Sequence, residues 1–460
     1  MVELVHHSPT PPSAVHAPDG ARTGIPQELV DYTIDFLHDD ISTLLASSLV
    51  SRRWLPASSS HLFACMRWPP CKHQWDLWAR GIGDACKCHF VGDTGTLEEL
   101  LLLLSSTPRI CDNVRDLRIT MSWPKRGGSW TDRHYIFTSP HQLVAILNLV
   151  PSVSRLKIMD LRFGPQASLI SFHAVRRLEE LTLIPFLHHR DIDYHCITNF
   201  LSYFQAISTL VVRFQMRQRI DVLPNLLLSA APPTQVSRLG LHYISNQYGS
   251  VWLSLLLERL DMASLTSLFW EDSPLDLPEN SPLTPAFHNF FRHCTNLRSL
   301  ACHRGTFRRL ISYPSSCPTL QHLHFIGVCA FVASGVRRTD WDAIPEIMAC
   351  PLASTVQDFT LDFTFSRGVS LSGFVPISVD RFQRQLRATL ESLDWTALND
   401  SCRRLRSLTM EIKIRLPGEV RREGQDREMC RTMVENFVKD HLLSPAQLNF
   451  GRVSQPFITR

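Results

Sequence analysis

The sequence predicts an α/β protein in which a small N-terminal helical module precedes an irregular repeat array, built as a curved parallel sheet with outer helices. Two observations favour this fold class. Residues 25–58 carry apolar side chains on several sides of short helical segments, and a short alternating apolar pattern recurs along most of the remaining chain. With 460 residues, of which 44% are hydrophobic and 20% charged, the chain is long enough for two or more folded domains.

Charge and cysteine content narrow the possible partners and compartments. The 47 basic and 43 acidic residues give a formal charge of +4, which is too even a balance to indicate a nucleic-acid or membrane partner. The 13 cysteines are scattered, and no charged-then-apolar leader opens the chain, so we expect free thiols in a reducing compartment. The longest leucine run, Leu100 to Leu104, is far shorter than the roughly 20 residues of a membrane span. We therefore expect a soluble protein of the cytoplasm, the nucleus or both, with no membrane partner.

The first structured element is expected just after a flexible tail, residues 1–23, which is rich in Pro, His and Ser. A helix is predicted from Pro26 to His38, because a narrow polar stripe is flanked by apolar residues over most of the circumference. Asp39 or Asp40 is expected to cap a second helix. Pro56 is expected to stop the chain segment that ends at Trp54.

Residues 24–70 resemble the F-box motif, and the match covers about 45 residues. It rests on these residues and segments: Ile25-Pro26, Leu29, Ile34, Leu37, Ile41, Leu44, "SLVSRRW" from Ser48 to Trp54 and "HLF" from His61 to Phe63. The resemblance implies a three-helix module that docks on the Skp adaptor of cullin–RING ubiquitin ligases. It implies adaptor contacts at Ile25, Pro26, Leu29, Ile34, Leu37, Ile41, Leu44, Val50 and Trp54. Ile25 stands where the family usually has Leu, which is a volume-conserving change.

Elementary energetics independently favour an outside partner for this module. A segment of fewer than about 50 residues buries too small a fraction of its surface to be stable alone, so its additional apolar faces need something to pack against. The alternative is a plain N-terminal helical cap on the following domain, in which Leu29 and Ile34 face only inward.

An apolar pattern of the form L-x-x-L-x-L recurs ten times after residue 70. Successive copies start 39, 25, 29, 29, 29, 32, 23, 36 and 49 residues apart, and chance would not place three intervals of 29 in succession. The copies begin at Val114, Val153, Leu178, Ile207, Val236, Leu265, Leu297, Leu320, Val356 and Leu405.

This spacing resembles that of leucine-rich repeats, in which a strand, a turn and a returning helix form each unit. The leucines then point into the array, because side chains alternate along a strand. We expect a linker and capping helix over 71–111, with a capping box at Thr96 and Glu99, and the array over 112–418. Insertions are expected at 122–130 and 366–398, the second with a helix at 380–393. A C-terminal helical cap and tail would occupy 419–460, with the helix at 419–443.

Together the two resemblances cover almost the whole chain and point to the F-box/leucine-rich-repeat class of substrate receptors. They imply a non-catalytic subunit of a Skp–cullin–F-box E3 ubiquitin ligase, in which the F-box binds the adaptor and the repeats hold a protein target. Holding the target would raise the effective concentration of its lysines near the charged ubiquitin carrier. The alternative is a leucine-rich-repeat scaffold that acts outside a ligase.

The target surface is expected on the concave face, built from residues that alternate with the inward leucines. These side chains change from basic to acidic along the array, with Phe269 as a candidate anchor near the middle. The candidate target-binding residues are Arg118, Arg155, Lys157, Arg213, Arg238, Phe269, His303, His322 and His324, followed by the acidic Asp358, Asp362 and Glu411.

The sequence contains no motif typical of an enzyme. It has no G-x-S-x-G elbow, no phosphate-binding G-x-x-x-x-G-K-[ST] and no H-E-x-x-H, and we expect neither a catalytic site nor a cofactor. Two groups could supply metal ligands, Cys71 with the "CKCH" segment at 86–89, and the histidines 303, 322 and 324. Free thiols and polar surface histidines explain them better, so no metal site is predicted. A nucleic-acid binder using Arg118, Lys125, Arg126, Lys157 and Arg213 is a less favoured alternative.

Overall fold

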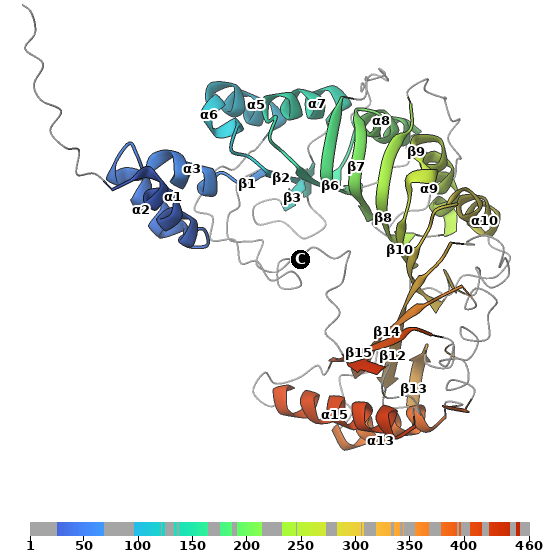
Figure 1. The fold of residues 1–460 in the computed structure, drawn as a ribbon. Helices are drawn as coiled ribbons and strands as arrows, with labels where there is room; N and C mark the ends of the chain where they lie inside the picture. The colour runs from blue at the N-terminus through green and yellow to red at the C-terminus, as the bar shows by residue number, and fades with distance from the viewer. Residues whose placement is uncertain are drawn as a thin grey trace, which may run out of the picture. The chain divides into compact units, whose positions relative to one another are not determined.

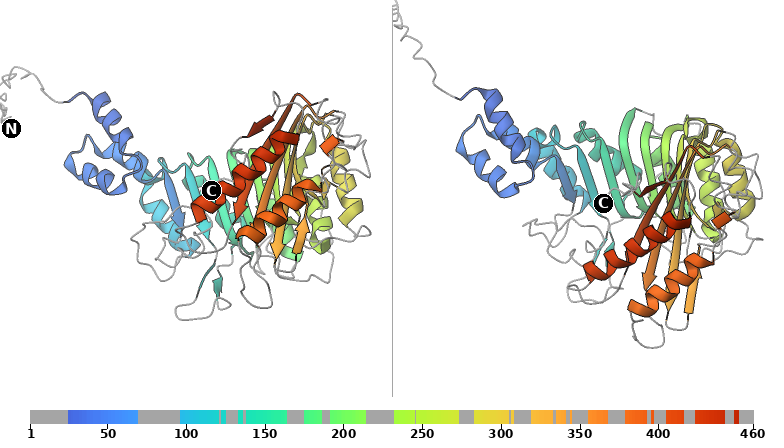
Figure 2. Two further views of the ribbon diagram at one scale, coloured as in Figure 1. Left: turned by 90° about the horizontal axis from the view of Figure 1, so that it is seen from below. Right: turned by 60° about the horizontal axis from the view of Figure 1, so that its bottom comes forward.

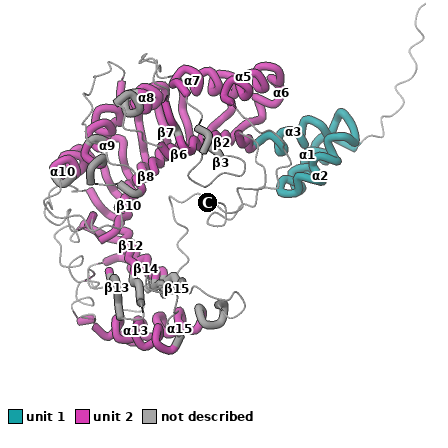
Figure 3. Tube along the Cα trace, turned by 180° about the vertical axis from the view of Figure 1, so that it is seen from behind, with its two compact units in different colours: residues 1–64 teal, residues 65–460 magenta. Residues whose placement is uncertain are grey.

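The computed structural model divides the chain into two compact units, unit 1 over Met1–Ala64 and unit 2 over Cys65–Arg460 (Figure 3). The residues that it describes are 25–68, 96–120, 122–124, 133–135, 138–163, 175–185, 191–213, 232–244, 246–272, 283–304, 306–307, 319–332, 335–340, 344, 355–367, 379–392, 395–396, 405–415, 423–441 and 448–450.

The described residues of unit 1, 25–64, form three helices, α1 (Gln27–Phe36), α2 (Ile41–Val50) and α3 (Leu55–Leu62) (Figure 1). Its core is small. Val30, Ile34 and Leu44 are buried, and four half-buried side chains pack against them: Leu37, Trp54, Ala57 and Leu62. So few buried side chains leave most of the apolar surface of the three helices outside the core of the unit.

The helix boundaries in unit 1 follow from local capping chemistry. Asp40 is the N-cap of α2, and its carboxylate accepts hydrogen bonds from the backbone N–H of Thr43 at 3.1 Å and from the Thr43 hydroxyl at 2.7 Å. The expectation that Pro56 stops a helix ending at Trp54 is wrong. Helix α2 ends at Val50 and Trp54 is the N-cap of α3, so Pro56 lies in the first turn, where its missing N–H costs no intrahelical hydrogen bond.

In the described part of unit 2, most strands form one 14-stranded sheet whose main path is parallel throughout. The α/β class is therefore confirmed, and β1 and β16 stand at two separate ends, so the described strands do not close into a barrel. In spatial order the strands are β1 (Cys65–Trp68), β2 (Asp116–Thr120), β5 (Arg155–Leu161), β6 (Arg176–Pro185), β7 (Phe204–Arg213), β8 (Thr234–Ile244), β10 (Ser267–Asp272), β11 (Ser299–His303), β12 (His322–Val332), β14 (Asp358–Arg367), β15 (Ser407–Arg415) and β16 (Leu448–Phe450).

All ten copies of the apolar pattern form strands of this sheet, in chain order, as predicted. The first, fourth and sixth residues of every copy are buried. In the second copy, for example, these are Val153, Leu156 and Ile158. Parallel registers align equivalent positions, so Leu156 lies opposite Leu117 on one side and Leu181 on the other. The resulting apolar rows form one face of the sheet, which we call the core face.

Helices cover the core face and contribute their own apolar sides to the same cluster. Figure 1 shows them along the outside of the row of strands, and Figure 2 shows the last two side by side at the C-terminal end of the sheet. They are α5 (Leu97–Ser106), α6 (Pro108–Cys111), α7 (Pro140–Leu149), α8 (Asp191–Leu201), α9 (Asn246–Arg259), α10 (Leu283–His293), α13 (Val379–Glu391) and α15 (Glu423–His441).

The predicted helix signals in unit 2 are confirmed. In the capping box of α5, the backbone N–H of Glu99 donates to Thr96 Oγ1 at 3.1 Å and that of Thr96 donates to Glu99 Oε2 at 3.0 Å. Ser139 and Gln142 form a second capping box at α7. Helices α13 and α15 occupy the positions predicted for the second insertion and the C-terminal cap. In the described residues, no helix is long and apolar enough to cross a membrane.

The short strands and hairpins were not predicted. Strands β1 and β16 extend the two ends of the sheet, and β9 (Leu260–Asp261) pairs with β8. Strand β13 (Gly335–Thr339) forms an antiparallel pair with β12, and β3 (Ser122–Pro124) with β4 (Arg133–Tyr135) in the first predicted insertion. Segments of two to five residues are too short for a period-two pattern to distinguish them from loops.

Candidate functional site

Unit 1 exposes two apolar stripes at helical spacing. On α1, Leu29, Tyr32 and Phe36 are 55%, 61% and 69% exposed, and the rings of Tyr32 and Phe36 meet edge to face with centroids 4.7 Å apart. On α2, the stripe consists of residues four apart: Ile41, Leu45 and Leu49. Leu49 is 86% exposed. Large apolar side chains repeated in this way on a small unit are typical of interaction surfaces.

The structure divides the nine predicted adaptor contacts between exposed positions and the core of unit 1. Five are exposed: Ile25, Pro26, Leu29, Ile41 and Val50. Ile34 and Leu44 are 0% and 1% exposed, so they are core residues and the expectation that they contact a partner directly is corrected. Leu37 and Trp54 are half-buried against that core. The reason is geometric, since α1 carries separate inward and outward apolar stripes that one linear motif does not distinguish.

Several exposed apolar residues were missing from the sequence-based set. They are Tyr32, Phe36, Leu45, Leu49 and Leu55. The available signal was the i, i+3, i+4, i+7 spacing from Leu29, which falls on a side of α1 different from that of Val30 and Ile34. The F-box pattern does not single out these five positions, so the resemblance alone did not predict that they are exposed.

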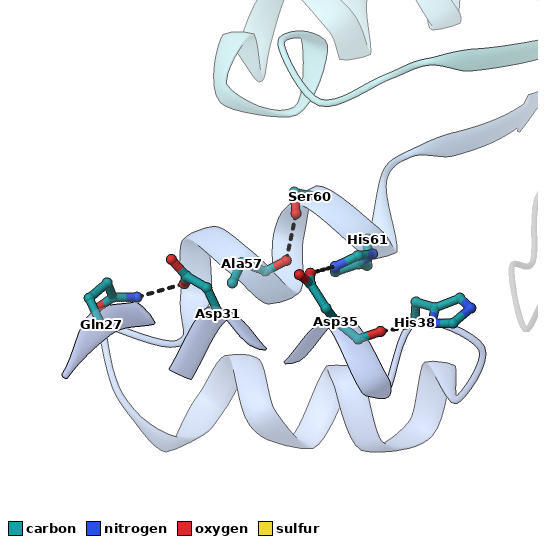
Figure 4. A network of polar contacts seen from close by, with 7 residues as sticks. All are labelled: Gln27, Asp31, Asp35, His38, Ala57, Ser60 and His61. Atoms are coloured by element: carbon teal, nitrogen blue, oxygen red, sulfur yellow. Dashed lines mark hydrogen bonds and ion pairs between the residues drawn. The ribbon is translucent and has the colours of Figure 1, made fainter. Parts of the chain in front are cut away.

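Polar contacts run along α1 and join it to α3 at His61 (Figure 4). Gln27 Nε2 donates to Asp31 Oδ1 at 2.8 Å and to the backbone carbonyl of Arg53 at 3.1 Å. His61 Nε2 lies 2.8 Å from Asp35 Oδ1. An open groove beside these contacts is lined by Gln27, Asp31, Asp35, Arg53, Pro56, Ala57 and Ser60. The contacts to Arg53 and His61 therefore link α1 to α3 and to the residues just before it.

Unit 2 presents a second candidate surface, the sheet face opposite the core face, which we call the opposite face. It consists of the third, fifth and seventh residues counted from the start of each copy. Its fifth-position row runs Arg118, Lys157, Thr182, Val211, Gly240, Phe269, Ala301, His324, Thr360 and Thr409, each aligned with the next by strand pairing. The third-position and seventh-position rows lie on either side of it and carry most of the charged and histidine side chains of this face.

Charge is distributed asymmetrically on the opposite face. From β2 to β8 the three rows carry five basic side chains and two carboxylates: Arg118, Arg155, Lys157, Arg213, Arg238, Asp116 and Glu180. From β10 to β15 the same positions carry four carboxylates and three histidines, and neither Lys nor Arg: Glu271, Asp358, Asp362, Glu411, His303, His322 and His324. The predicted change from basic to acidic is therefore present on one face.

The basic half contains both a paired and an unpaired arrangement. Arg118 donates from Nη2 to Asp116 Oδ2 at 2.7 Å and from Nε to the same oxygen at 3.1 Å. Among the described residues, Lys157 and Arg213 form no ion pair, and Arg213 Nε is buried without a hydrogen-bond acceptor. Burial lowers the pKa of Lys157, and the nearby charges of Arg213 and Arg118 lower it further, against the raising effect of Glu180 and Asp116.

A buried histidine–carboxylate pair lies at the middle of the opposite face. His242 is 2% exposed, and its Nδ1 lies 2.6 Å from Glu271 Oε2. Burial lowers the pKa of His242, as does Arg213, against the raising effect of Glu271. Burial would raise the pKa of Glu271, but the hydrogen bond from His242 and the charges of His242, His303 and Arg213 lower it. A neutral His242 that donates Nδ1–H to an ionised Glu271 is consistent with the lowered pKa of each residue.

Histidine–carboxylate contacts recur in the acidic half. His322 Nδ1 lies 2.9 Å from Asp358 Oδ2, and His324 Nε2 lies 3.7 Å from Asp362 Oδ2. Asp362 and Glu411 are buried and are opposite each other in the register of β14 and β15. In the described part of the chain, no three His, Cys, Asp or Glu side chains are grouped to hold a metal ion. Cys71, the 86–89 segment, Lys125 and Arg126 lie outside the described residues.

The structure differs from the predicted set of target-binding residues in two respects. Phe269 is 6% exposed, because it stacks against His242 at a centroid distance of 4.7 Å and packs with Ala301 and Ile326, so little of the ring is left for a partner. The predicted set lacked His242 and Glu271. Both residues occupy the seventh position of their repeat copy, as do the predicted Arg213 and His303, so the repeat pattern could have identified them.

Comparison of the sequence with models of known protein families found no match, and comparison with curated proteins found no similar sequence.

Proposed function

We propose that this chain is the substrate-recognition subunit of a Skp–cullin–F-box E3 ubiquitin ligase. In this proposal unit 1 is the F-box that binds the Skp adaptor, and unit 2 is an irregular leucine-rich-repeat array that holds the target protein. The chain would act through proximity, because a held target presents its lysines to the charged ubiquitin carrier at high effective concentration.

One observation carries the proposal, namely the pair of exposed apolar stripes on α1 and α2. The two stripes expose six large apolar side chains, whereas the described core of the unit buries three apolar residues. Leaving that much apolar surface in water is unfavourable, so a complex with a partner that covers it would be stabilised. Burying each of them would stabilise a complex by up to about 1.5–3 kcal/mol. The F-box resemblance of residues 24–70 names the Skp adaptor as the molecule that would cover them.

The test compares two charges placed on the same helix. Leu45→Asp places a carboxylate in the α2 stripe, and Ala46→Asp places one at the next residue, which is also exposed but about 100° around the helix. Burying an unpaired carboxylate costs several kcal/mol, so Leu45→Asp should weaken adaptor binding by about a hundredfold or more. Ala46→Asp should bind like the original chain.

The measurement is co-purification and titration of each full-length variant with the Skp adaptor, with circular dichroism to check folding. Equal adaptor binding by Leu45→Asp, Ala46→Asp and the original chain would refute the F-box assignment. If the original chain itself binds no adaptor, the stripes serve another partner, and a leucine-rich-repeat scaffold outside a ligase becomes the better description.

A further inference from the structure

Two cations on the opposite face are only partly compensated: Glu180 and Asp116 act on Lys157, and Arg213 acts on Glu271, without a direct ion pair among the described residues. Lys157 and Arg213 are both half-buried. Buried charges in proteins are usually paired, because removing them from water costs free energy that an opposite charge offsets. An anion supplied from outside would complete this partial compensation.

The strand register places these two side chains on the same face, with one strand between them. Lys157 lies on β5, with Thr182 of β6 and then Val211 of β7 beside it in the same row. Arg213 is two residues beyond Val211, on the same side of β7. Its guanidinium is close enough to lower the pKa of Lys157, as Arg118 also does. Between the two cations, Thr182 is nearly buried, so no large side chain from this row separates them.

Two exposed arginines add positive charge on either side of Lys157 and Arg213. Arg155 and Arg238 are exposed on the same face, on β5 and β8. The two carboxylates of this half are already engaged, since Asp116 accepts from Arg118 and Glu180 accepts from the Thr182 hydroxyl at 3.1 Å. The surplus charge of the basic half is therefore positive, and Lys157 and Arg213 lie near its middle.

The other half of the face excludes a long polyanion as the natural ligand. A nucleic acid running along the strand row would pass from the basic half onto Glu271, Asp358, Asp362 and Glu411, where its phosphates would be repelled. A protein segment can be acidic over a few residues and neutral or basic beyond them. Such a segment complements both halves of the face.

We propose that the opposite face of unit 2 binds a short acidic segment of a partner protein, whose carboxylate or phosphate group contacts Lys157 and Arg213. Calling that partner the target of ubiquitination rests on the proposed function, but the binding itself does not. Arg213 would offer its fork of N–H donors and Lys157 a point charge, while Thr182 lies between them in the row.

The experiment measures peptide binding to the purified full-length chain by fluorescence anisotropy at physiological ionic strength. The probes are four labelled oligomers of equal length: a peptide of alternating Asp and Ser, the same peptide with the serines phosphorylated, its Asn-for-Asp counterpart, and an oligouridylate. The variant is Lys157→Gln with Arg213→Gln. Its matched control is Arg109→Gln with Arg292→Gln, which removes two exposed cations from helices α6 and α10.

We expect the two acidic peptides to bind the original chain and the control equally. The Lys157→Gln, Arg213→Gln variant should lose about tenfold or more in affinity, as expected for losing charge-assisted hydrogen bonds. Tighter binding of the phosphorylated peptide would assign the anion as phosphate, and equal binding would assign it as carboxylate. Either result supports the proposal.

Three outcomes would overturn it: no binding of either acidic peptide, equal loss in the variant and its control, or tightest binding of the oligouridylate with a steep salt dependence. These measurements need no adaptor. Failure of the anion site therefore leaves the F-box test on α2 unaffected, and failure of the F-box test leaves peptide binding to unit 2 unaffected.

Discussion

Gly327 occupies a place in the sheet where even one methyl group does not fit. It lies on β12 directly opposite Phe363 of β14, and both residues are buried. A Cβ at this position would lie 2.2 Å from Phe363 Cε1 and 2.6 Å from Cδ1. The ring of Phe363 is itself held in the core, with its centroid 5.9 Å from that of Phe325. Gly327→Ala can therefore be accommodated only if the Phe363 ring or a strand moves.

The expected cost follows from these distances. Forcing an extra methyl into a packed core costs about 1–3 kcal/mol, whereas a glycine-to-alanine change without a clash stabilises by about 0.4–1 kcal/mol through the unfolded chain. The clash at 2.2 Å is with a buried ring rather than the end of a flexible side chain, so we expect the first effect to exceed the second. Gly327→Ala should destabilise unit 2 by about 1–2 kcal/mol.

The assay is urea denaturation of the full-length chain followed by fluorescence, with Gly240→Ala as the matched control. A Cβ at Gly240 would lie 3.5 Å from its nearest heavy atom, Val211 Cγ2, so this change should be neutral or slightly stabilising. In a Phe363→Ala background, Gly327→Ala should lose its cost, because the clashing ring is gone. A Gly327→Ala chain as stable as the original, or one equally destabilised in both backgrounds, would refute the reasoning.

Three further predictions test unit 1 and the middle of the sheet. Ile34→Ala should destabilise unit 1 by about 2–5 kcal/mol, whereas Leu49→Ala should leave its denaturation midpoint almost unchanged, since Ile34 is 0% and Leu49 is 86% exposed. Hydrogen bonds from Ser42 and Thr43 lower the pKa of Asp40 to about 2, so its NMR titration should show that value and move upward in Thr43→Val. Burial holds the pKa of His242 below its unfolded value, so it stabilises the fold above about pH 6.5 and this contribution is lost as the pH falls. His242→Asn keeps a donor for Glu271 but does not titrate, so its denaturation midpoint should fall less between pH 8 and pH 5; an unchanged pH dependence would contradict the assignment.

The sequence by itself determined the elements whose signals are local. The alternation within each L-x-x-L-x-L copy predicts a strand and identifies which of its residues are buried. All ten strands and the core face could therefore be predicted from the sequence. The capping box at Thr96 and Glu99 and the cap at Asp40 were equally readable, because each is made by residues three apart. The row order of basic and acidic residues followed from the same alternation.

Only the tertiary structure decided features that depend on what packs against what. In α1, Leu29 and Ile34 are both apolar and both fit the motif, yet one is 55% exposed and the other is in the core, because α3 covers one side of the helix. His242 and Glu271 are 29 residues apart and meet only through the register of β8 and β10. Lys157 and Arg213 likewise approach each other across three strands. Periodicity fixes the direction of a side chain relative to its own strand or helix, whereas its neighbours, its burial and its charge partners are set by non-local pairing that no single segment encodes.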